Sequence, residues 1–512
     1  MLHRYIITKT CSVGSLLLAL FFAACTSQAQ NAEQFAKETD EFLTKLTNTV
    51  KELPSISVVV VKGDRPVFMK SYGYADIANK VKAQNNTPYY IASSTKSFMG
   101  MAAAILDHQG KVKLNATLAE SMPYIKFDTS VKADQVKLRD LLTHTSGIKN
   151  AYFGFRAAYS GNIDRKEMDW VLENKSGRRD EIGKYRYTNL GYNIYTHMTD
   201  KKLGMPWQDV LDNLLFKPLG MKRTTAYMSL AKKKGWKYAK PYFTLGNNGY
   251  EELYLMKKDN TMQSAGGVIT TVEDMANWLI FNINEGKFKG KQLVPAKVVR
   301  MAHSPLVKRK SDRRPYGSQG YGLGWENATY QGKRVLQHDG GFAGFRTHVA
   351  FMPDTKVGIT VLVNDGWIGG HVAHELSRFA FDWWMNEGKS SRNLEAYIKT
   401  ATKKVKKYRK LIAKDKAKRA KRAWTLTEPL ASYVGTYYNK SLGKVCVKLK
   451  NGKLEVSHGN MHAVAEPYPK ENAIRLEMVP KRGWGLKFIV EQGKKASALS
   501  MDGDVFKRIQ SK

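Results

Sequence analysis

Cysteine is scarce in this chain, with three residues among 512. Cys11 and Cys25 fall near the start, so Cys446 is the one cysteine of the remaining chain. A single thiol cannot form an intramolecular disulfide, and cysteines cannot build a metal site here. We therefore expect a protein held together by its hydrophobic core. Cys446 lies in the alternating segment KVCVKLK, where we predict a buried thiol in a strand.

Apolar runs long enough to span a bilayer are also missing. The 12-residue run Val13–Ala24 follows a basic start at Arg4 and precedes small residues, a pattern typical of a secretory signal peptide. We expect residues 1–29 to be this signal and the mature protein to be exported. Two cleavage sites stay open: one after Ala29, which leaves a periplasmic or secreted protein, and one before Cys25, which would make it an outer-membrane-associated lipoprotein.

Acidic residues are few: 45 Asp and Glu stand against 83 Lys and Arg, a net charge of +38. Residues 399–422 hold 13 cations and one acid, so this segment contributes +12 of the total. Apolar residues recur in it at spacings of three and four, which predicts an amphipathic basic linker helix over 389–424. We interpret the helix as a solvated spacer. The alternative is attraction to an anionic envelope surface, such as lipopolysaccharide, acidic lipid or a cell-wall polymer.

Nucleic acid is not an expected partner. Export removes the protein from most nucleic acid, no nucleic-acid-binding motif is present, and aromatic residues are not interleaved with the cations for base stacking. The sequence does not indicate an oligomeric state.

The order of predicted elements divides the chain into two folded parts. Apolar strands at Ile56–Val61 and within Phe345–Asn364 flank a long region of helices and loops, which predicts an α/β (α+β) domain over 32–388. Its antiparallel sheet is expected to join the two ends of the domain, beside an all-α region. Residues 425–512 read as short alternating strands with turn residues, which predicts a small β-barrel or β-sandwich, and we expect the barrel.

Residues 91–98, IASSTKSF, raise the first question about chemistry. Ser93 and Lys96 are one helical turn apart, so both side chains lie on one face at the start of a buried apolar helix. Desolvation would lower the pKa of the lysine until it could accept a proton from the serine. Ser94 and Thr95 have the same chemistry but face elsewhere on the helix. A helix cap and a surface lysine would also explain the motif, so it does not decide alone.

Two later segments carry further candidates. YRYTNLGY places Tyr187 and Asn189 together, and a lysine ammonium nearby would favour the phenolate of the tyrosine. A tyrosine-rich core loop is the alternative. In VLQHDGGF, His338 stands just before a strand, and Gly341 offers a backbone N–H that no side chain obstructs. A polar turn entering the sheet is the alternative there.

Other histidines are given structural roles. His144, in LTHTSG, is predicted to be a turn or cap residue. His371 and His374 are three apart on a probable helix face, but no third ligand has suitable spacing. We therefore predict no metal site, and nothing in the sequence indicates a cofactor.

The order of the three motifs is more specific than any one of them. S-x-x-K opening a buried helix, then Y-x-N, then H-x-G before a late strand, resembles the serine β-lactamase and penicillin-binding-protein superfamily. The likeness is greatest to class C β-lactamases and their esterase and D-aminopeptidase relatives. The segments LLTHTSGI, SAGGVITTVEDMANWL and YGLGWE agree with it. The resemblance covers about residues 35–388, and residues 425–512 resemble the lipocalin-like β domain that follows some members.

The resemblance implies roles for particular residues. Ser93 would be the acylated nucleophile and Lys96 its base. Tyr187 would assist proton transfer to the leaving group and activate the water that releases the acyl group. Asn189 would bind the substrate amide.

It also implies the remainder of the substrate site, formed by His338, Gly340 and Gly341. The N–H groups of Ser93 and Gly341 would form the oxyanion hole. His338 replaces the lysine of the superfamily's K-T-G motif, a departure typical of esterase- and peptidase-like relatives that argues against efficient β-lactam hydrolysis. No counterpart of the class A deacylation glutamate is evident, so deacylation would depend on Tyr187 and Lys96.

We therefore expect an exported serine hydrolase. It would act through a Ser93 acyl-enzyme on a small-molecule or peptide substrate with an amide or ester bond, as a D-amino-acid peptidase, carboxypeptidase, esterase or β-lactamase-like enzyme. The alternative is a catalytically weak penicillin-binding-like protein that binds an envelope polyanion.

Overall fold

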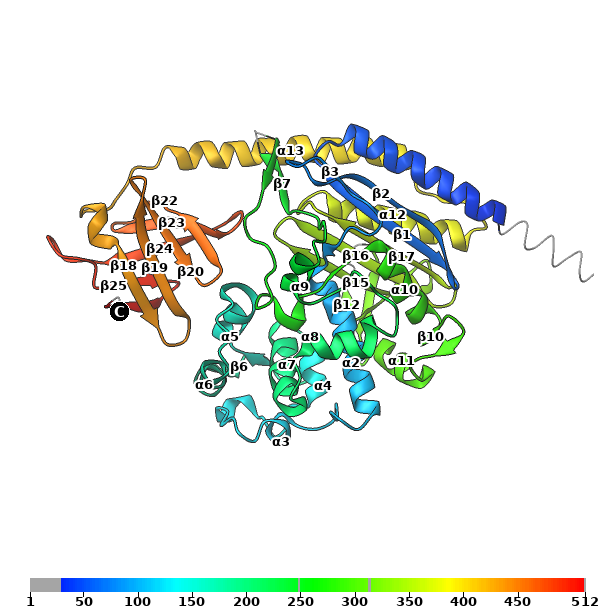
Figure 1. The fold of residues 1–512 in the computed structure, drawn as a ribbon, viewed down its shortest axis with the longest axis horizontal. Helices are drawn as coiled ribbons and strands as arrows, with labels where there is room; N and C mark the ends of the chain where they lie inside the picture. The colour runs from blue at the N-terminus through cyan, green and yellow to red at the C-terminus, as the bar shows by residue number, and fades with distance from the viewer. Residues whose placement is uncertain (1–28, 247–248, 312–314, 511–512) are drawn as a thin grey trace, which may run out of the picture.

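The computed structural model describes residues 29–246, 249–311 and 315–510 (Figure 1). The predicted signal segment, with Cys11 and Cys25, lies outside the described residues. A mixed α/β domain fills most of the molecule, a second sheet forms its C-terminal end, and one long helix runs between them. No helix in the described part of the chain is both long and apolar enough to cross a membrane.

The first sheet has nine antiparallel strands in the order β12-β13-β14-β15-β16-β17-β1-β2-β3. Strand β1 pairs with both β2 and β17, so the two ends of the domain meet in one sheet, as the sequence predicted. The strands are β1 Ser55–Lys62, β2 Arg65–Asp76, β3 Val81–Lys82, β12 Val307–Ser311, β13 Gly317–Tyr321, β14 Glu326–Tyr330, β15 Lys333–Phe342, β16 Phe345–Met352 and β17 Val357–Val363.

Helices cover both faces of this sheet, which explains why β1 is buried from Ser55 to Val61. Val59 and Val61 point into one core, shared with α2 (Thr95–His108), α10 (Val272–Ile283) and α11 (Ala296–His303). Val58 and Val60 point into a second core, shared with the helix 29–49 and α12 (Gly369–Met385). Each fully buried valine stabilises the fold by roughly 1.5–3 kcal/mol.

An all-α region sits beside the sheet and forms the lower half of the domain in Figure 1. It is anchored by a short strand pair, β4 (Tyr89–Tyr90) with β9 (Ile269–Thr270), next to the 3₁₀ turn η1 (Ala92–Ser94). Its helices are α3 Leu118–Ser121, α4 Leu138–Leu142, α5 Ala151–Phe155, α6 Arg165–Lys175, α7 Leu190–Leu203, α8 Trp207–Leu211 and α9 Met228–Lys233, with π-helical turns η3 Arg156–Ser160 and η4 Asp212–Phe216.

The basic segment forms one helix, α13 (Leu394–Ala420), inside the predicted linker 389–424. Ile398, Ala401 and Val405 bury its apolar stripe in the second core of the α/β domain. Most of its lysines are exposed, so the first half of the helix is packed and its charge faces solvent. The helix then extends to the C-terminal sheet (Figure 1).

The C-terminal sheet curls into a nearly closed antiparallel barrel, with strand order β21-β20-β19-β18-β26-β25-β24-β23-β22. Its strands are β18 Gly435–Asn439, β19 Gly443–Lys450, β20 Lys453–His458, β21 Met461–Val464, β22 Glu466–Pro467, β23 Ala473–Val479, β24 Arg482–Ile489, β25 Ala498–Met501 and β26 Asp504–Ile509. Asn451 and Gly452 link β19 to β20 with φ of 50° and 69°, as a tight hairpin with positive φ at both central residues requires. Cys446 on β19 is free but only half-buried, so the prediction of a buried thiol was wrong.

The barrel packs directly on the all-α region. Phe155, Tyr159 and Phe342 of the α/β domain lie against the barrel's core. Polar contacts fix the same interface: the Tyr152 hydroxyl donates to Asp504 at 2.9 Å, and the Asn460 N–H donates to the Ser160 carbonyl at 2.9 Å. Because Phe342 ends strand β15, the barrel reaches the strand that carries the H-x-G motif.

Candidate active site

Ser93 lies in η1, the turn between β4 and α2. Ala92, just before it, has φ of 46°, a conformation that costs a non-glycine residue about 1 kcal/mol or more. The turn is held against strand β15, because the Ser94 hydroxyl donates to the His338 carbonyl at 3.2 Å. A Cβ on Gly340 would collide with the Ile91 carbonyl, so a glycine is required where η1 meets the strand. This close approach sets the nucleophile beside the H-x-G motif.

Lys96 is fully buried in the first turn of α2, and its Nζ lies 3.2 Å from Ser93 Oγ. The Nζ also donates to Asn189 Oδ1 at 2.8 Å and to the Ala265 carbonyl at 2.6 Å. Burial holds the pKa of Lys96 well below its ordinary value, and no carboxylate pairs with it among the described residues. A neutral amine has two N–H groups and one lone pair. The two acceptors take the N–H groups, which leaves the lone pair for the Ser93 hydroxyl.

The YGLGWE segment packs on α2 around this lysine. A Cβ on Gly324 would collide with the Lys96 carbonyl, and one on Gly100 would collide with the Leu323 carbonyl. The rings of Tyr187 and Tyr192 lie 5.0 Å and 5.5 Å from the Lys96 Nζ. Backbone on one side and aromatic rings on the other thus exclude water from the amine.

Tyr187 shares a hydrogen bond with the Ser93 side chain and lines the same pocket. Tyr187 is 44% exposed, but desolvation of its hydroxyl in the pocket raises the pKa of Tyr187 above its ordinary value, although the hydrogen bond with Ser93 acts in the opposite direction. The expectation of a favoured phenolate was therefore wrong: the neighbouring amine is desolvated and the phenol keeps its proton. Tyr187 is placed as a proton donor. His144 stacks behind it, with ring centroids 4.5 Å apart.

His144 itself has the structural environment that the sequence suggested. It is buried, has φ of 63°, and its Nδ1 accepts from the Thr188 N–H at 3.3 Å. Burial is the largest cause that lowers the pKa of His144 well below its ordinary value. It stays neutral and supports the Tyr187 ring.

Asn189 stands at the N-terminus of α7 and contacts the buried Lys96 as well as the pocket. Its Oδ1 is occupied by Lys96, so the side chain is fixed in orientation while still lining the pocket. The helix behind it packs closely on α4, because a Cβ on Gly191 would collide with the Leu141 carbonyl. The predicted contact of Asn189 with a substrate amide stays a prediction.

Strand β15 has an open edge at the site. Its pairing with β14 ends at Gln337, which faces Glu326, while its pairing with β16 continues to Phe342. Residues 338–342 therefore present one free edge beside η1. Gly340 faces η1, and Gly341 has its Cα on the opposite face, against Arg346. A free edge with small residues is suited to bind an extended substrate through backbone groups.

His338 is neutral in this structure. Its Nδ1 donates to the Asp339 carbonyl at 2.7 Å, so its Nε2 accepts from the Tyr321 hydroxyl at 3.1 Å. Burial lowers the pKa of His338 to about 3. The residue thus does not supply the positive charge that a lysine at the same place would.

A separate polar cluster lies under β15, on the face away from Ser93. Asp339 accepts from His348 Nδ1 at 2.7 Å and from His374 Nε2 at 3.1 Å. Burial would raise the pKa of Asp339, but His374 and the hydrogen bonds from both histidines hold it well below its ordinary range. The cluster's candidate ligand atoms lie within 4.8 Å of one another, so His374 has two possible co-ligands that its spacing from His371 along the helix did not indicate. His371 is not part of it.

The described contacts among Asp339, His348 and His374 are hydrogen bonds between these side chains. Arg346 adds positive charge near Asp339, which opposes a cation. Nothing in the cluster reaches Ser93, because Asp339 and His338 point to opposite faces of the strand.

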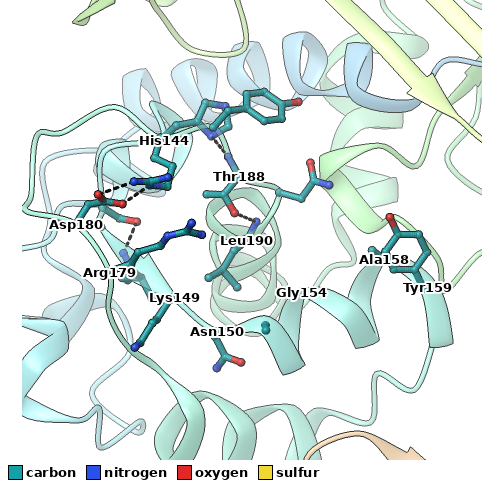
Figure 2. Close-up of a pocket in the computed structure, with 17 residues that line it drawn as sticks. His144, Lys149, Asn150, Gly154, Ala158, Tyr159, Arg179, Asp180, Thr188 and Leu190 are labelled. Carbon is teal, nitrogen blue, oxygen red and sulfur yellow. Dashed lines mark hydrogen bonds and ion pairs between the residues drawn. The ribbon is translucent and has the colours of Figure 1, made fainter. Parts of the chain in front are cut away.

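Two cavities lie at the site, and the first of them is lined by Ser93. One of about 380 Å³ is lined by Ser93, Tyr187, Asn189 and Gly341 on the catalytic side, and by residues 479–482 of the barrel on the other. A second of about 350 Å³ shares Tyr187 and Asn189 with it and extends over His144 and α5 (Figure 2). All seven predicted site residues are thus brought to one place, at the open edge of β15 or beside it.

The sequence did not identify three contributors to the site. The carbonyl of Ala265, within SAGG, and the hydroxyl of Tyr321, within YGLGWE, belong to segments noted only for their resemblance. The barrel residues 479–482 carried no signal at all, since nothing local links them to a serine almost 400 positions earlier.

This fold and this arrangement of serine, buried lysine and tyrosine define the β-lactamase-fold class of serine hydrolases. The chain belongs to the Beta-lactamase family, whose model matches residues 42–367. It is 26% identical over 331 residues to "Protein flp" of Staphylococcus aureus (strain MW2), covering 61% of this chain and 60% of that protein. It is 24% identical over 334 residues to "Unguisins hydrolase ungD'" of Aspergillus campestris, covering 61% and 58%. The chain thus spans about three fifths of these curated relatives.

Solved structures share the fold. An octameric penicillin-binding protein homologue from Pyrococcus abyssi matches with a TM-score of 0.57 at 18% identity, over 92% of this chain and 99% of that one. D-amino acid amidase from Ochrobactrum anthropi SV3, complexed with L-phenylalanine amide, matches with a TM-score of 0.53 at 20% identity, over 65% and 91%.

Proposed function

We propose that this protein is an exported serine hydrolase that cleaves an amide or ester bond through an acyl-enzyme on Ser93. The observation that carries the proposal is the buried, carboxylate-free Lys96, whose Nζ lies 3.2 Å from the Ser93 hydroxyl. An amine kept neutral by burial can take the serine proton, which is the step that makes a hydroxyl nucleophilic. The export segment predicted at residues 1–29 supports an envelope or extracellular location.

Acylation involves three proton transfers. Lys96 Nζ accepts the proton of Ser93 as Oγ attacks the substrate carbonyl, and the carbonyl oxygen becomes an oxyanion. The N–H groups of Ser93 and Gly341 receive it, a contribution of about 3–4 kcal/mol per donor. As the C–N or C–O bond breaks, Tyr187 gives its proton to the leaving group and recovers one from Lys96. The acyl group then remains as an ester on Ser93.

Deacylation reverses the same path with water. Tyr187 and Lys96 take a proton from water as it attacks the ester, and Ser93 Oγ leaves with a proton returned to it. The neutral His338 makes the pocket less attractive to a β-lactam carboxylate than a lysine would be. A D-amino-acid peptide or amide, or a small ester, is therefore the preferred substrate class; the fold shared with D-amino acid amidase supports including amides.

The proposal is tested by covalent labelling. The exported form is incubated with a fluorophosphonate probe, and the adduct is located by peptide mass spectrometry. We expect the adduct on Ser93 and none in Ser93→Ala. Ser94, one residue away and anchored to His338, is the internal control within the same peptide. An adduct on Ser94, or no adduct with any serine-directed probe, would overturn the proposal.

The second candidate, a weakly catalytic protein that binds an envelope polyanion, is supported by α13. Its lysines at 403, 406, 407, 410, 414, 416 and 418 are exposed along one continuous helix. Binding to lipopolysaccharide that survives Ser93→Ala but is lost when four of these lysines become glutamine would favour this candidate. Turnover by the same preparation decides whether it replaces the hydrolase or accompanies it.

A further inference from the structure

The far wall of the catalytic pocket comes from the C-terminal barrel. The turn between β23 and β24 contributes Val479, Pro480, Lys481 and Arg482 to the cavity that also contains Ser93. Sequence alone places these residues in a separate domain. The structure makes them neighbours of the nucleophile, so the barrel is positioned to act on the substrate and not only to stabilise the fold.

This turn is held in place from the α/β domain. The Tyr254 hydroxyl donates to the Met478 carbonyl and accepts from the His462 N–H at 3.2 Å. Lys481 Nζ pairs with Glu251 at 2.9 Å and lies 4.1 Å from the centre of the Phe243 ring. Contacts on both sides of the turn fix it against the pocket.

The charges at this wall are unbalanced. Glu251 neutralises Lys481, but within the described residues no carboxylate pairs with Arg482 or with Arg346, which lines the pocket beside it. Among the residues that the structure describes, no Asp or Glu lines this cavity. Arg346 is half-buried, and burial lowers its pKa; Asp365 and Asp339 act in the opposite direction, and Arg482 acts in the same direction as burial. The two guanidinium groups line one cavity without a carboxylate in ion-pair contact with either, so an anion in the cavity would pair with them.

The open edge of β15 shows which part of a substrate reaches these arginines. A carbonyl held at the Gly341 N–H would direct its acyl chain along the strand past Phe342 and Ala343. The turn that follows at Gly344 lies in the same cavity as Arg482 and Trp367. The acyl chain therefore leads away from Tyr187 and toward the two guanidinium groups.

We propose that Arg346 and Arg482 form an anion-binding subsite that selects substrates whose acyl part carries a carboxylate. The proposal rests on the proposed function, because it concerns the acyl group transferred to Ser93. It adds that the C-terminal barrel is part of the active site. The net charge of +38 places cations over much of the surface, but these two differ from surface lysines in lying within one pocket at the nucleophile.

The first test compares two esters that differ only in charge, p-nitrophenyl hydrogen adipate and p-nitrophenyl adipamate. We expect the parent protein to have a higher kcat/KM for the carboxylate, and Arg482→Ala to lower the ratio of the two by about tenfold, mainly through KM. Arg482→Glu should reverse the preference. Lys448→Ala removes one exposed charge of the same barrel away from the cavity and is the matched control. Equal kcat/KM values for the two esters, or an equal fall for both in Arg482→Ala, would overturn the subsite.

The second test measures binding without turnover. Adipic acid monoamide and adipamide are titrated into Ser93→Ala by calorimetry, with the quenching of Trp367, which lines the pocket, as a second signal. The anion should bind more tightly, and adding Arg346→Ala and Arg482→Ala should remove the difference. If the parent protein shows no Ser93-dependent labelling, the proposed function fails, while this measurement still decides the subsite. If both compounds bind alike, the subsite is wrong whatever the turnover.

Discussion

Lys96 and Lys257 are both buried lysines, but their surroundings differ. Lys257 donates to the Ala226 carbonyl at 2.7 Å, and burial lowers its pKa to about 8, with Asp259 acting in the opposite direction. Lys96 has no such acid, and a hydroxyl lies within reach of its amine. Burial by itself lowers the pKa of an amine. At Lys96 a hydroxyl also lies within hydrogen-bond distance, so the neutral amine has a proton that it can accept. The comparison separates a catalytic lysine from a structural one.

The largest effect on acylation should follow from removing the amine of Lys96, and removal of the amine of Lys257 is the matched control. Lys96→Met should slow acylation of Ser93 by several orders of magnitude, because the nucleophile loses its base. Lys257→Met should leave the acylation rate far closer to that of the parent protein. The measurement is the rate of fluorophosphonate labelling, with circular dichroism to verify folding. Similar labelling rates for the two variants would remove the distinction between the lysines.

Tyr187→Phe should have the next largest effect. The hydroxyl that hydrogen-bonds Ser93 is lost while the ring near Lys96 is kept, so turnover should fall by about 10²–10⁴-fold. Esters with a good leaving group need less protonation and should be affected less than amides. Steady-state rates on an ester and the matching amide measure this. An equal fall for both would contradict the role of Tyr187 as donor to the leaving group.

Gly324 and Gly332 test whether the backbone packed against Lys96 affects acylation. Both have φ of 77°, so an alanine is strained equally at each, by roughly 1–2 kcal/mol. A Cβ on Gly324 would also collide with the Lys96 carbonyl, whereas nothing lies within 4 Å of one on Gly332. Gly324→Ala should therefore lower both stability and the labelling rate, and Gly332→Ala only stability. Urea unfolding and labelling measure the two; equal losses in both variants would show that the contact with Lys96 does not matter.

The smallest effect concerns stability against pH. The pKa of Lys257 falls from 10.5 to about 8 on folding, so between these pH values the unfolded chain binds more protons than the folded one. The free energy of unfolding should therefore rise with pH across that window. Lys257→Met should flatten the rise, and Lys448→Met, at an exposed position, should not. Urea midpoints at pH 7, 8, 9 and 10 test this, and an unchanged slope in Lys257→Met would contradict it.

The sequence predicted the sheet well because its strands are strongly patterned. The runs around Val59 and Val361 are buried on both faces, and local hydrophobicity is enough to show it. The spacing of Ser93 and Lys96 also predicts their contact, because both lie within one turn. Contacts between residues that are far apart in the sequence could not be predicted in this way, because no local pattern records them.

The protonation states of the site residues were harder to predict from the sequence than the strands were. The phenolate expected at Tyr187 assumed a charged Lys96, whereas the extent of desolvation depends on packing by Gly324 and the surrounding rings. The prediction of no metal site compared residue spacing along one helix. The possible co-ligands of His374, Asp339 and His348, lie on β15 and β16 instead. The barrel's share in the pocket depends on how two domains dock, which no local pattern in either one records.

The most direct test of the central claim is the pH dependence of acylation at Ser93. A neutral Lys96 predicts that the labelling rate falls on acidification through one protonation, at a pH well below the 10.5 of an ordinary lysine, and that Lys96→Met lacks this step. His338, with a pKa of about 3, adds no step near neutral pH. A rate that rises only as pH approaches 10.5, or the same profile in Lys96→Met, would contradict the assignment of Lys96 as the base.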